Sequence, residues 1–395
     1  MMDELQADLF ERKQQGLYRK RLISQSAQGP HSVINGKSVL SFCSNDYLGL
    51  ANHPDIKQAF IAAAERYGVG SGSAHLVNGH SQCHHDCERM LADFCGRERA
   101  LLFSTGYMAN LAIGSALLGR NDIIFQDKLN HASLIDAARL SDAKFKRYRH
   151  NDLAQLSRLL DDSQQHQSNS RRLIMADAVF SMDGDKADGV ALSALARQTN
   201  SWLMLDDAHG FGVLGKTGAG LCEEQSLTPL DVPVLMATLG KAVGVSGAFV
   251  AGSEALIETL IQSARSYIYT TASPPANAAA VMESIRIIRL ESWRREKLIE
   301  LIDYFKQQAT GLSCELMPSD TAIQPIIIGD NQAVLGISQQ LFEQGIHVTA
   351  IRPPTVPKGS ARLRITLSAA HEKKDIDMLI RALSGLLAPA ISCED

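Results

Sequence analysis

The sequence lacks the features that would mark a membrane, secreted or nucleic-acid-binding protein. No stretch approaches the roughly 20 apolar residues needed to span a bilayer, and no apolar segment of signal-peptide length follows the acidic start at residues 1–5. The seven cysteines show no paired CxxC spacing, which fits a reducing compartment better than a disulfide framework. A net charge of −4 gives no overall field that would gather nucleic acid or an anionic membrane. We therefore expect a cytoplasmic protein with neither of these partners.

What the sequence does contain is typical of a globular protein with more than one domain. Its composition, 45% hydrophobic and 21% charged residues, is that of an ordinary globular protein. Its length of 395 residues exceeds what a single hydrophobic core usually supports. From residue 100 onward, short apolar runs alternate with helical patterns, as a mostly parallel α/β sheet requires. Past residue 285 the composition becomes richer in Arg, Lys and Glu. We predict an N-terminal helix and arm over 1–50, a large α/β domain over 51–284 and a smaller α+β domain over 285–395.

Within this scheme, individual elements can be placed by their patterns. Residues 3–24 have the pattern of an amphipathic helix, and residues 54–67 that of a second one. In the C-terminal part, strands are expected near 322–328, 347–351 and 362–367, with a last helix over 375–387. A polar surface loop is expected at 163–170.

The stretch from 202 to 241 carries the clearest chemical signal. Two apolar runs, 202–205 and 233–240, lead into Asp206 and Lys241. Such runs are typical of buried parallel strands, and ligands of open α/β sheets bind at the carboxyl ends of those strands. An acid and an amine placed there suit pyridoxal 5'-phosphate (PLP), whose ring nitrogen needs an anion and whose aldehyde needs an amine. The alternative is two ordinary strands with a solvated Asp and Lys.

Other strand ends and helix starts also offer polar groups to such a pocket. A predicted strand over 100–103 leads into a helix that begins near Gly106, where backbone N–H groups could seat a phosphate. A second strand, over 122–127, precedes His131, and a third, over 172–177, precedes a polar turn. Each strand is therefore followed by polar residues that could contact a cofactor bound at this edge of the sheet.

The segment 210–217 satisfies two nucleotide-binding patterns, GxGxxG and GxxxxGK[ST]. Both patterns need a helix directly after the loop, yet Gly218 and Gly220 make a poor helix start. The carboxylates of Asp206 and Asp207 would also repel a phosphate seated nearby. We interpret these glycines as a sharp turn beside the pocket, and keep a nucleotide-binding protein as an alternative.

A cysteine and histidine cluster raises the question of a metal. Cys83, His84, His85 and Cys87, with His80 nearby, have side chains of the zinc-ligand type. The segment continues as an amphipathic helix with no second ligand pair downstream, and small buried cysteines commonly serve packing. We therefore predict no metal site.

Five ordered motifs together resemble the α-oxoamine synthases, which are fold-type I PLP enzymes that condense an amino acid with an acyl thioester and release carbon dioxide. The resemblance spans about residues 17–385. Its motifs lie at 44–50, 180–185, 206–210, 238–241 and 350–357. Within the family, the Arg-Pro-Pro-Thr-Val-Pro loop at 352–357 and the segment 363–371 are most similar to the enzymes that join L-alanine to a pimeloyl thioester in biotin synthesis. The resemblance also implies a homodimer with its active sites at the interface.

The resemblance implies a role for each matching residue. Lys241 would hold PLP and then act as the base, Asp206 would face the ring nitrogen, and His131 would stack on the ring and help polarise the thioester. The other implied cofactor contacts are Gly106, Tyr107, Ser181, His209 and Thr238, with Thr270 or Thr271 reaching the phosphate from a second subunit. Arg352 would clamp the alanine carboxylate. The other implied substrate contacts are Arg19, Asn45 and Thr355.

Several points stay open at this level. Asp177 stands where relatives commonly carry Glu, and His75 where they often carry Arg or Gly. The acyl carrier is either coenzyme A or an acyl carrier protein, for which the basic stretch at 144–149 is a candidate docking site. The sister enzyme that joins glycine to acetyl-CoA would share every cofactor residue. A PLP-binding homologue without turnover is disfavoured by the joint presence of Lys241, Asp206 and His131.

Overall fold

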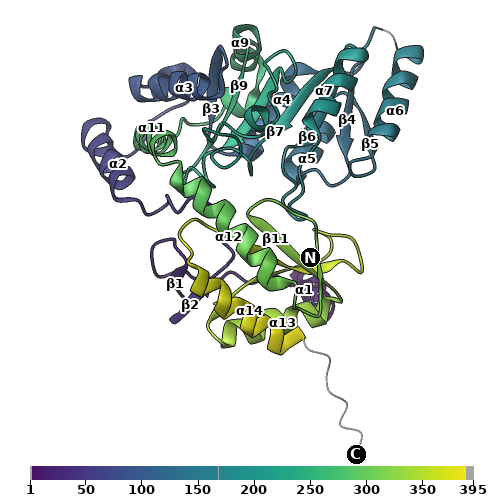
Figure 1. Ribbon diagram of the computed structural model, residues 1–395. Coiled ribbons are helices and arrows are strands. Elements are labelled where there is room, and N and C mark those ends of the chain that lie inside the picture. The colour runs from purple at the N-terminus through teal and green to yellow at the C-terminus, as the bar shows by residue number, and fades with distance from the viewer. Residues whose placement is uncertain (1, 168, 388–395) are drawn as a thin grey trace, which may run out of the picture. The chain divides into compact units, whose positions relative to one another are not determined.

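The computed structural model describes residues 2–167 and 169–387, and the chain forms two compact units (Figure 1). The large unit comprises residues 48–181 and 186–295, apart from residue 168. The small unit comprises residues 2–47, 182–185 and 296–387. Residues 388–395, which belong to the C-terminal domain predicted above, lie outside the described residues.

The large unit is built on a seven-stranded sheet with the strand order β3-β9-β8-β7-β6-β4-β5. Neighbouring strands from β8 to β5 are parallel, whereas β9 runs antiparallel to β3 and to β8. The strands are β3 Arg99–Phe103, β4 Ile123–Asp127, β5 Lys144–Tyr148, β6 Arg172–Asp177, β7 Trp202–Asp206, β8 Val234–Thr238 and β9 Ala248–Gly252. Every residue of β4, β6 and β9 is buried, which explains why these strands are apolar runs without alternation. The expected α/β class with a mostly parallel sheet is confirmed.

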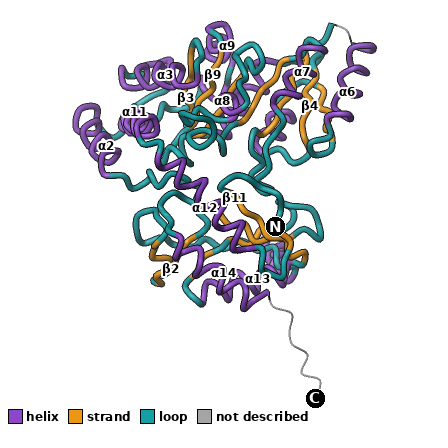
Figure 2. The backbone as a smooth tube through the Cα atoms, viewed as in Figure 1, coloured by secondary structure: helices purple, strands orange, loops and turns teal. Residues whose placement is uncertain are grey.

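Helices surround this sheet, and Figure 2 shows β3, β4 and β9 among them. The helices are α2 Pro54–Tyr67, α3 Gln82–Cys95, α4 Gly106–Leu117, α5 Ala132–Leu140, α6 Leu153–His166, α7 Gly189–Gln198, α8 Leu221–Glu224, α9 Glu254–Ser263, α10 Arg265–Ile268 and α11 Pro275–Leu290. A π-helical turn, η1, covers His75–Gly79. One buried cluster joins α4, α5, α9 and α10 to the strands. On the other face, the Phe249 ring contacts Phe211, which in turn contacts Phe94 of α3.

The small unit contains two small sheets and the two ends of the described chain. Strands β1 His31–Ile34, β2 Lys37–Ser41 and β12 Ile346–His347 form one sheet, and β10 Glu315–Leu316, β11 Ile323–Gly329, β14 Ala361–Thr366 and β13 Thr349–Ile351 form the other. Its helices are α1 Met2–Gln14, α13 Asn331–Glu343 and α14 Lys373–Leu387, together with most of α12 Trp293–Ala309. Hydrogen bonds within the unit tie the N-terminal segment to the C-terminal one, such as Thr366 N to Phe42 O at 2.8 Å.

The structure corrects two local predictions. The first helix ends at Gln14 and not near residue 24, because the chain turns at Gly16, whose φ of +66° is a left-handed conformation that favours glycine. The polar segment from 163 is helical up to His166, so the predicted loop begins later than expected. Residue 168 of that loop lies outside the described residues.

Candidate active site

The carboxyl ends of β6, β7 and β8 meet the N-termini of α4 and α5 around a cavity of about 190 Å³ in the large unit. Eight residues that the sequence predicted for the site line this cavity: Gly106, Tyr107, His131, Ser181, Asp206, His209, Thr238 and Lys241. Asn110, Ser133, Asp177, Ala208 and Met236 complete the lining. Thr270 and Thr271 are not among the lining residues of this chain. The sequence therefore predicted most of the polar groups of one enclosed pocket.

Asp206 is the buried acid of this pocket, with 4% of its surface exposed. Its Oδ2 accepts a hydrogen bond from Asn110 Nδ2 at 2.8 Å, and its Oδ1 accepts one from the backbone N–H of Ala208 at 3.1 Å. Asn110 Nδ2 also donates to Ser133 Oγ at 2.8 Å. These bonds hold the carboxylate in one orientation inside the cavity.

Lys241 supplies the amine on the same cavity. Its Nζ lies 2.7 Å from Nε2 of His209, a residue that follows β7 just as Lys241 follows β8. Partial burial favours the neutral form of an amine, which is its nucleophilic form. The pair therefore places an amine and an imidazole next to each other on the cavity.

His131 begins α5 as its N-cap residue, and its Nδ1 accepts from the backbone N–H of Ser133 at 3.3 Å. The same nitrogen lies 2.7 Å from Ser133 Oγ. With Nδ1 accepting, the ring carries its proton on Nε2. Burial, together with the charge of Lys241, lowers the pKa of His131, while the charge of Asp206 raises it. The result is a neutral imidazole with an N–H group to donate.

The N-terminus of α4 supplies an anion-binding element. Thr105 caps the helix by accepting from Met108 N at 3.2 Å, which leaves the earlier N–H groups of Gly106 and Tyr107 at the open first turn. Such a turn favours phosphate through its N–H groups and the helix dipole. Thr238 and Ser181 add hydroxyl groups to the cavity. The hydroxyl of Tyr107 donates to Asp136, and this bond raises the pKa of Tyr107.

The donor set of this cavity fits PLP group by group. The amine of Lys241 suits the aldehyde, the buried carboxylate of Asp206 suits the ring nitrogen, and His209 suits the phenolic oxygen. The open turn of α4 suits the phosphate. Asn110 Oδ1 is buried and has no hydrogen-bond partner among the described residues, so the cavity also holds an acceptor that a ligand could use.

Of the five predicted substrate contacts, His131 lines the cavity described above, and three others lie together in the small unit. Arg19, Arg352 and Thr355 line a cavity of about 1200 Å³ that is also lined by Lys13 and Lys20. Burial and then the charge of Arg19 lower the pKa of Arg352. Two guanidinium groups in one cavity form a site that favours an anion. Asn45 is not among the lining residues, and its Oδ1 accepts from Arg364 at 3.3 Å.

The glycine-rich segment 210–217 is a closed turn and not a phosphate loop. The carboxylate of Glu223 accepts from Thr217 N at 3.0 Å, from Thr217 Oγ1 at 3.0 Å and from Ala219 N at 3.0 Å. The next helix, α8, has four residues and starts only at Leu221. Because the chain's own acid occupies backbone N–H groups of this loop, the nucleotide-binding alternative is wrong.

The basic stretch at 144–149 forms the edge strand β5 and its end. Lys146 pairs with Asp162 at 2.8 Å, and Arg149 pairs with Asp152 at 2.7 Å. Arg147 donates to Lys128 O, and Lys144 donates to Gln167 at 2.7 Å. This local neutralisation weakens the case for an acidic partner at this edge.

Sequence reasoning missed Asn110 and Ser133, and it gave no role to Asp177. Asn110 is a polar residue on the buried side of the otherwise apolar helix α4, which is the signal that could have identified it. Ser133 and Asp177 carry no such signal. The hydrogen bond from Asn110 to Ser133 arises only when α4 packs on α5, and the contact of Asp177 with His131 arises only when β6 and α5 are brought together.

Comparisons with known proteins identify the family of this chain. The family model described as aminotransferase class I and II matches residues 37–383. The 8-amino-7-oxononanoate synthase of Saccharophagus degradans is 54% identical over 97% of this chain and 96% of its own length.

Among solved structures, the serine palmitoyltransferase from S. paucimobilis with a bound PLP-myriocin aldimine matches with a TM-score of 0.91 and 28% identity. The match covers 97% of this chain and 96% of the other. The 8-amino-7-oxononanoate synthase from Francisella tularensis matches with a TM-score of 0.77 and 33% identity, covering 88% of this chain and 97% of the other. No helix within residues 2–167 and 169–387 is long and apolar enough to cross a membrane.

Proposed function

This chain belongs to the class I and II aminotransferase family, and we propose that it is a PLP-dependent acyltransferase that makes 8-amino-7-oxononanoate for biotin synthesis. The reaction condenses L-alanine with a pimeloyl thioester and releases carbon dioxide and the free thiol carrier. The observation that carries the proposal is the pairing of Lys241 with Asp206 in one cavity of a chain 54% identical to an 8-amino-7-oxononanoate synthase. The α-oxoamine synthase motifs that surround these residues support it.

When bound, PLP supplies an electron sink that stabilises negative charge at Cα of the amino acid and of the condensed product. Lys241 would hold the aldehyde carbon of the cofactor, and its Nζ would be the base that takes the Cα proton of L-alanine. That role needs a neutral amine, and Nζ lies 2.7 Å from His209 Nε2. Asp206 would keep the ring nitrogen protonated through its buried carboxylate, which faces the cavity.

His131 would contact both the cofactor and the thioester. Its ring would stack on the cofactor, and its Nε2–H would donate to the carbonyl oxygen of the thioester. Since Ser133 fixes Nδ1 as the acceptor, the ring presents that N–H without rotating. A donor held toward the developing oxyanion stabilises the transition state more than the ground state.

The start of α4, with Gly106 and Tyr107, would hold the phosphate group, and Ser181 and Thr238 would lie near it. Thr270 or Thr271 completes this subsite from a second copy of the chain, so the active enzyme is a homodimer. Both threonines lie outside the cavity of their own chain, which supports this arrangement.

The two arginines of the small unit bind the acidic groups of the substrates. Arg352 clamps the carboxylate of L-alanine, and Arg19, Asn45 and Thr355 contact substrate beside it. The shared cavity of Arg19, Arg352 and Thr355 supports this assignment. Coenzyme A and an acyl carrier protein both stay possible as the thiol carrier.

The second candidate is the sister reaction of glycine with acetyl-CoA. Its cofactor residues would be the same, so the PLP cavity supports both reactions equally. The 54% identity to an 8-amino-7-oxononanoate synthase favours the first.

The cofactor assignment is tested by the visible spectrum of the protein mixed with PLP, and by mass spectrometry after borohydride reduction. We expect a yellow protein, a pyridoxyl group fixed on Lys241, and no such group in Lys241→Ala. A colourless protein, or a modified residue other than Lys241, would overturn the proposal.

A further inference from the structure

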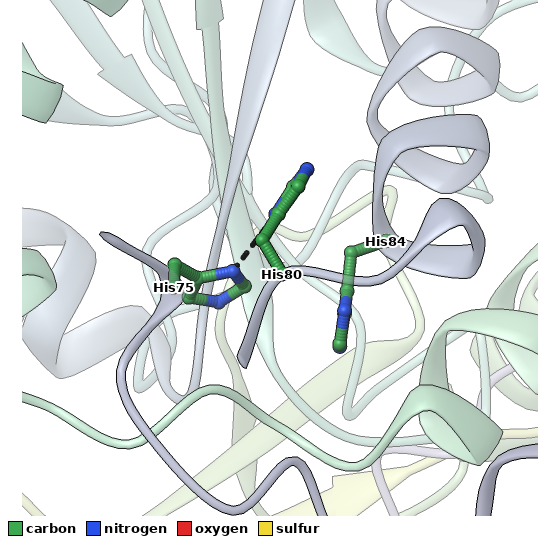
Figure 3. A group of neighbouring side chains, drawn as sticks. All are labelled: His75, His80 and His84. Atoms are coloured by element: carbon green, nitrogen blue, oxygen red, sulfur yellow. Dashed lines mark hydrogen bonds between the residues drawn. The ribbon is translucent and has the colours of Figure 1, made fainter. Parts of the chain in front are cut away.

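Three histidine rings lie together in the large unit, outside the PLP cavity. His75 lies in the π-helical turn η1, His80 in the loop that follows it, and His84 in the first turn of α3. Figure 3 shows the three rings side by side, with a dashed line from His75 to His80. That line joins the two Nδ1 atoms, which are 3.0 Å apart. One ring nitrogen from each histidine lies within 4.8 Å of the other two.

These spacings are close to those of a metal site. Zn²⁺ binds imidazole nitrogen at about 2.0–2.1 Å, so two tetrahedral ligands lie about 3.4 Å apart. The 3.0 Å separation of His75 and His80 therefore needs only a small rotation to admit an ion. Since the three ring nitrogens lie within 4.8 Å of one another, no gap would have to close by more than about 1.4 Å, which side-chain torsions can provide.

The outer nitrogen of one ring meets the acceptor that a metal-binding histidine usually has. His84 Nε2 lies 2.7 Å from the backbone oxygen of Ser273. Such an acceptor fixes the tautomer and leaves Nδ1 with its lone pair. His80 Nε2 lies 3.9 Å from the carboxylate of Glu88, which is beyond hydrogen-bond distance. The ring of His75 stacks on Tyr267, with 5.0 Å between ring centroids, which limits its orientation. One ring thus has a second shell in place, and another has a packing partner.

All three rings also favour the neutral form that metal binding requires. Burial, followed by the charges of His84 and His80, lowers the pKa of His75 to about 3. Partial burial of the imidazole, followed by the charges of His84 and His85, lowers the pKa of His80, and burial lowers the pKa of His84. The neighbouring cysteines do not belong to this group: Cys83 Sγ donates to Pro275 O at 3.3 Å, and Cys87 is fully buried.

We propose that His75, His80 and His84 form a binding site for a divalent transition-metal ion of the zinc type. His75 and His80 bind through Nδ1. His84 becomes the third ligand when its Nδ1 exchanges the hydrogen bond from Ser81 N, now 3.1 Å long, for the ion. The fourth position is open to water, because His80 is exposed. This inference does not depend on the proposed reaction.

A bound ion would restrict the motion of the loop from His75 to His84 relative to residues 271–273. Ala74 forms a β-bridge with Thr271, and Ala272 N donates to Ser73 O at 3.0 Å. An ion that links His75 to His84 would therefore fix both ends of the loop against residues 271–273.

The test is isothermal titration of the metal-stripped holoenzyme with Zn²⁺ at pH 8, where imidazole is neutral. We expect one saturable site per chain. In His75→Asn and in His80→Asn, the affinity should fall at least about tenfold, because each variant removes one ligand. The matched control is His85→Asn, since His85 is exposed and lies outside the three-histidine group. The control should bind Zn²⁺ as tightly as the parent.

His84 is left unchanged because it also caps α3, and its replacement could unfold the protein. Thermal unfolding without metal confirms that each variant is folded. With saturating Zn²⁺, the midpoint should rise in the parent and in His85→Asn, and should rise less in the other two histidine variants. Absence of a saturable site, or full affinity in either His75→Asn or His80→Asn, would overturn the proposal.

Discussion

Asp177 and Asp206 are register partners at the ends of the parallel strands β6 and β7. Each is 4% exposed. Burial and the charge of Asp206 raise the pKa of Asp177 well above its usual range. Asp177 also accepts a hydrogen bond from His131 N at 2.7 Å, which a protonated carboxyl can still do through its carbonyl oxygen. A proton on Asp177 relieves the repulsion between two adjacent carboxyl groups and leaves the charge on Asp206.

The two acids should therefore respond differently to the same substitution. Asp177→Asn replaces a neutral acid by a neutral amide, whose oxygen can still accept the hydrogen bond from His131 N. We therefore expect kcat to change by less than about tenfold. Asp206→Asn removes the charge that holds the ring nitrogen, and kcat should fall by about a hundredfold or more. Steady-state kinetics with saturating PLP makes the comparison. Equal losses in both variants would contradict this division of roles.

Acid should destabilise the protein through His75. Its pKa is about 3 in the folded protein and about 6.5 when unfolded. Between these values the unfolded chain binds a proton that the folded chain does not, so stability falls as the pH drops from 6.5 toward 3. As the pH falls from 6.5 to 4, the free energy of unfolding should decrease by about 1–2 kcal/mol less in His75→Asn than in the parent. Urea unfolding of metal-free protein measures this, with His85→Asn as the control. Parallel pH profiles for parent and His75→Asn would refute it.

The turn at 210–217 should depend on Glu223 for stability. In Glu223→Ala, Thr217 and Ala219 lose the carboxylate that accepts their N–H groups. We expect a loss of about 1–2 kcal/mol in the free energy of unfolding. Glu224→Ala is the matched control, because it removes only the partly exposed pair with Lys186 and should cost less than about 1 kcal/mol. Neither the variants nor the parent should bind ATP. ATP binding by the parent would support the nucleotide-binding alternative for residues 210–217.

The carboxylate clamp should depend on the shape of Arg352 as well as its charge. Lysine keeps the charge but cannot form two parallel hydrogen bonds with a carboxylate. In Arg352→Lys, we expect KM for L-alanine to rise about tenfold or more, while KM for the acyl thioester changes little. Initial rates over a matrix of both substrates separate the two constants. An unchanged KM for L-alanine would place its carboxylate elsewhere.

The sequence predicted the pocket well where one strand end or helix start determines a residue's place. Asp206 ends an apolar strand, Lys241 follows the next one closely, and Gly106 starts a helix shortly after a strand. Asp177 and Ser133 could not be assigned in this way, because their contacts depend on how β6 and α4 pack against α5. The sequence did point to His80 and His84 together with the cysteines beside them. It did not join His75 to them, because that contact forms around an irregular turn. The early end of α1 depends on the conformation of Gly16, which the apolar pattern did not reveal.

The account is tested most directly by identifying the product. The enzyme with PLP is supplied with L-alanine and a pimeloyl thioester, or with glycine and acetyl-CoA, and the product mass, free thiol and carbon dioxide are measured together. We predict 8-amino-7-oxononanoate with one carbon dioxide and one thiol per turnover, and a kcat/KM for the first pair that exceeds the second by about tenfold or more. Turnover of glycine with acetyl-CoA at an equal or higher kcat/KM, or product formed without loss of carbon dioxide, would contradict it.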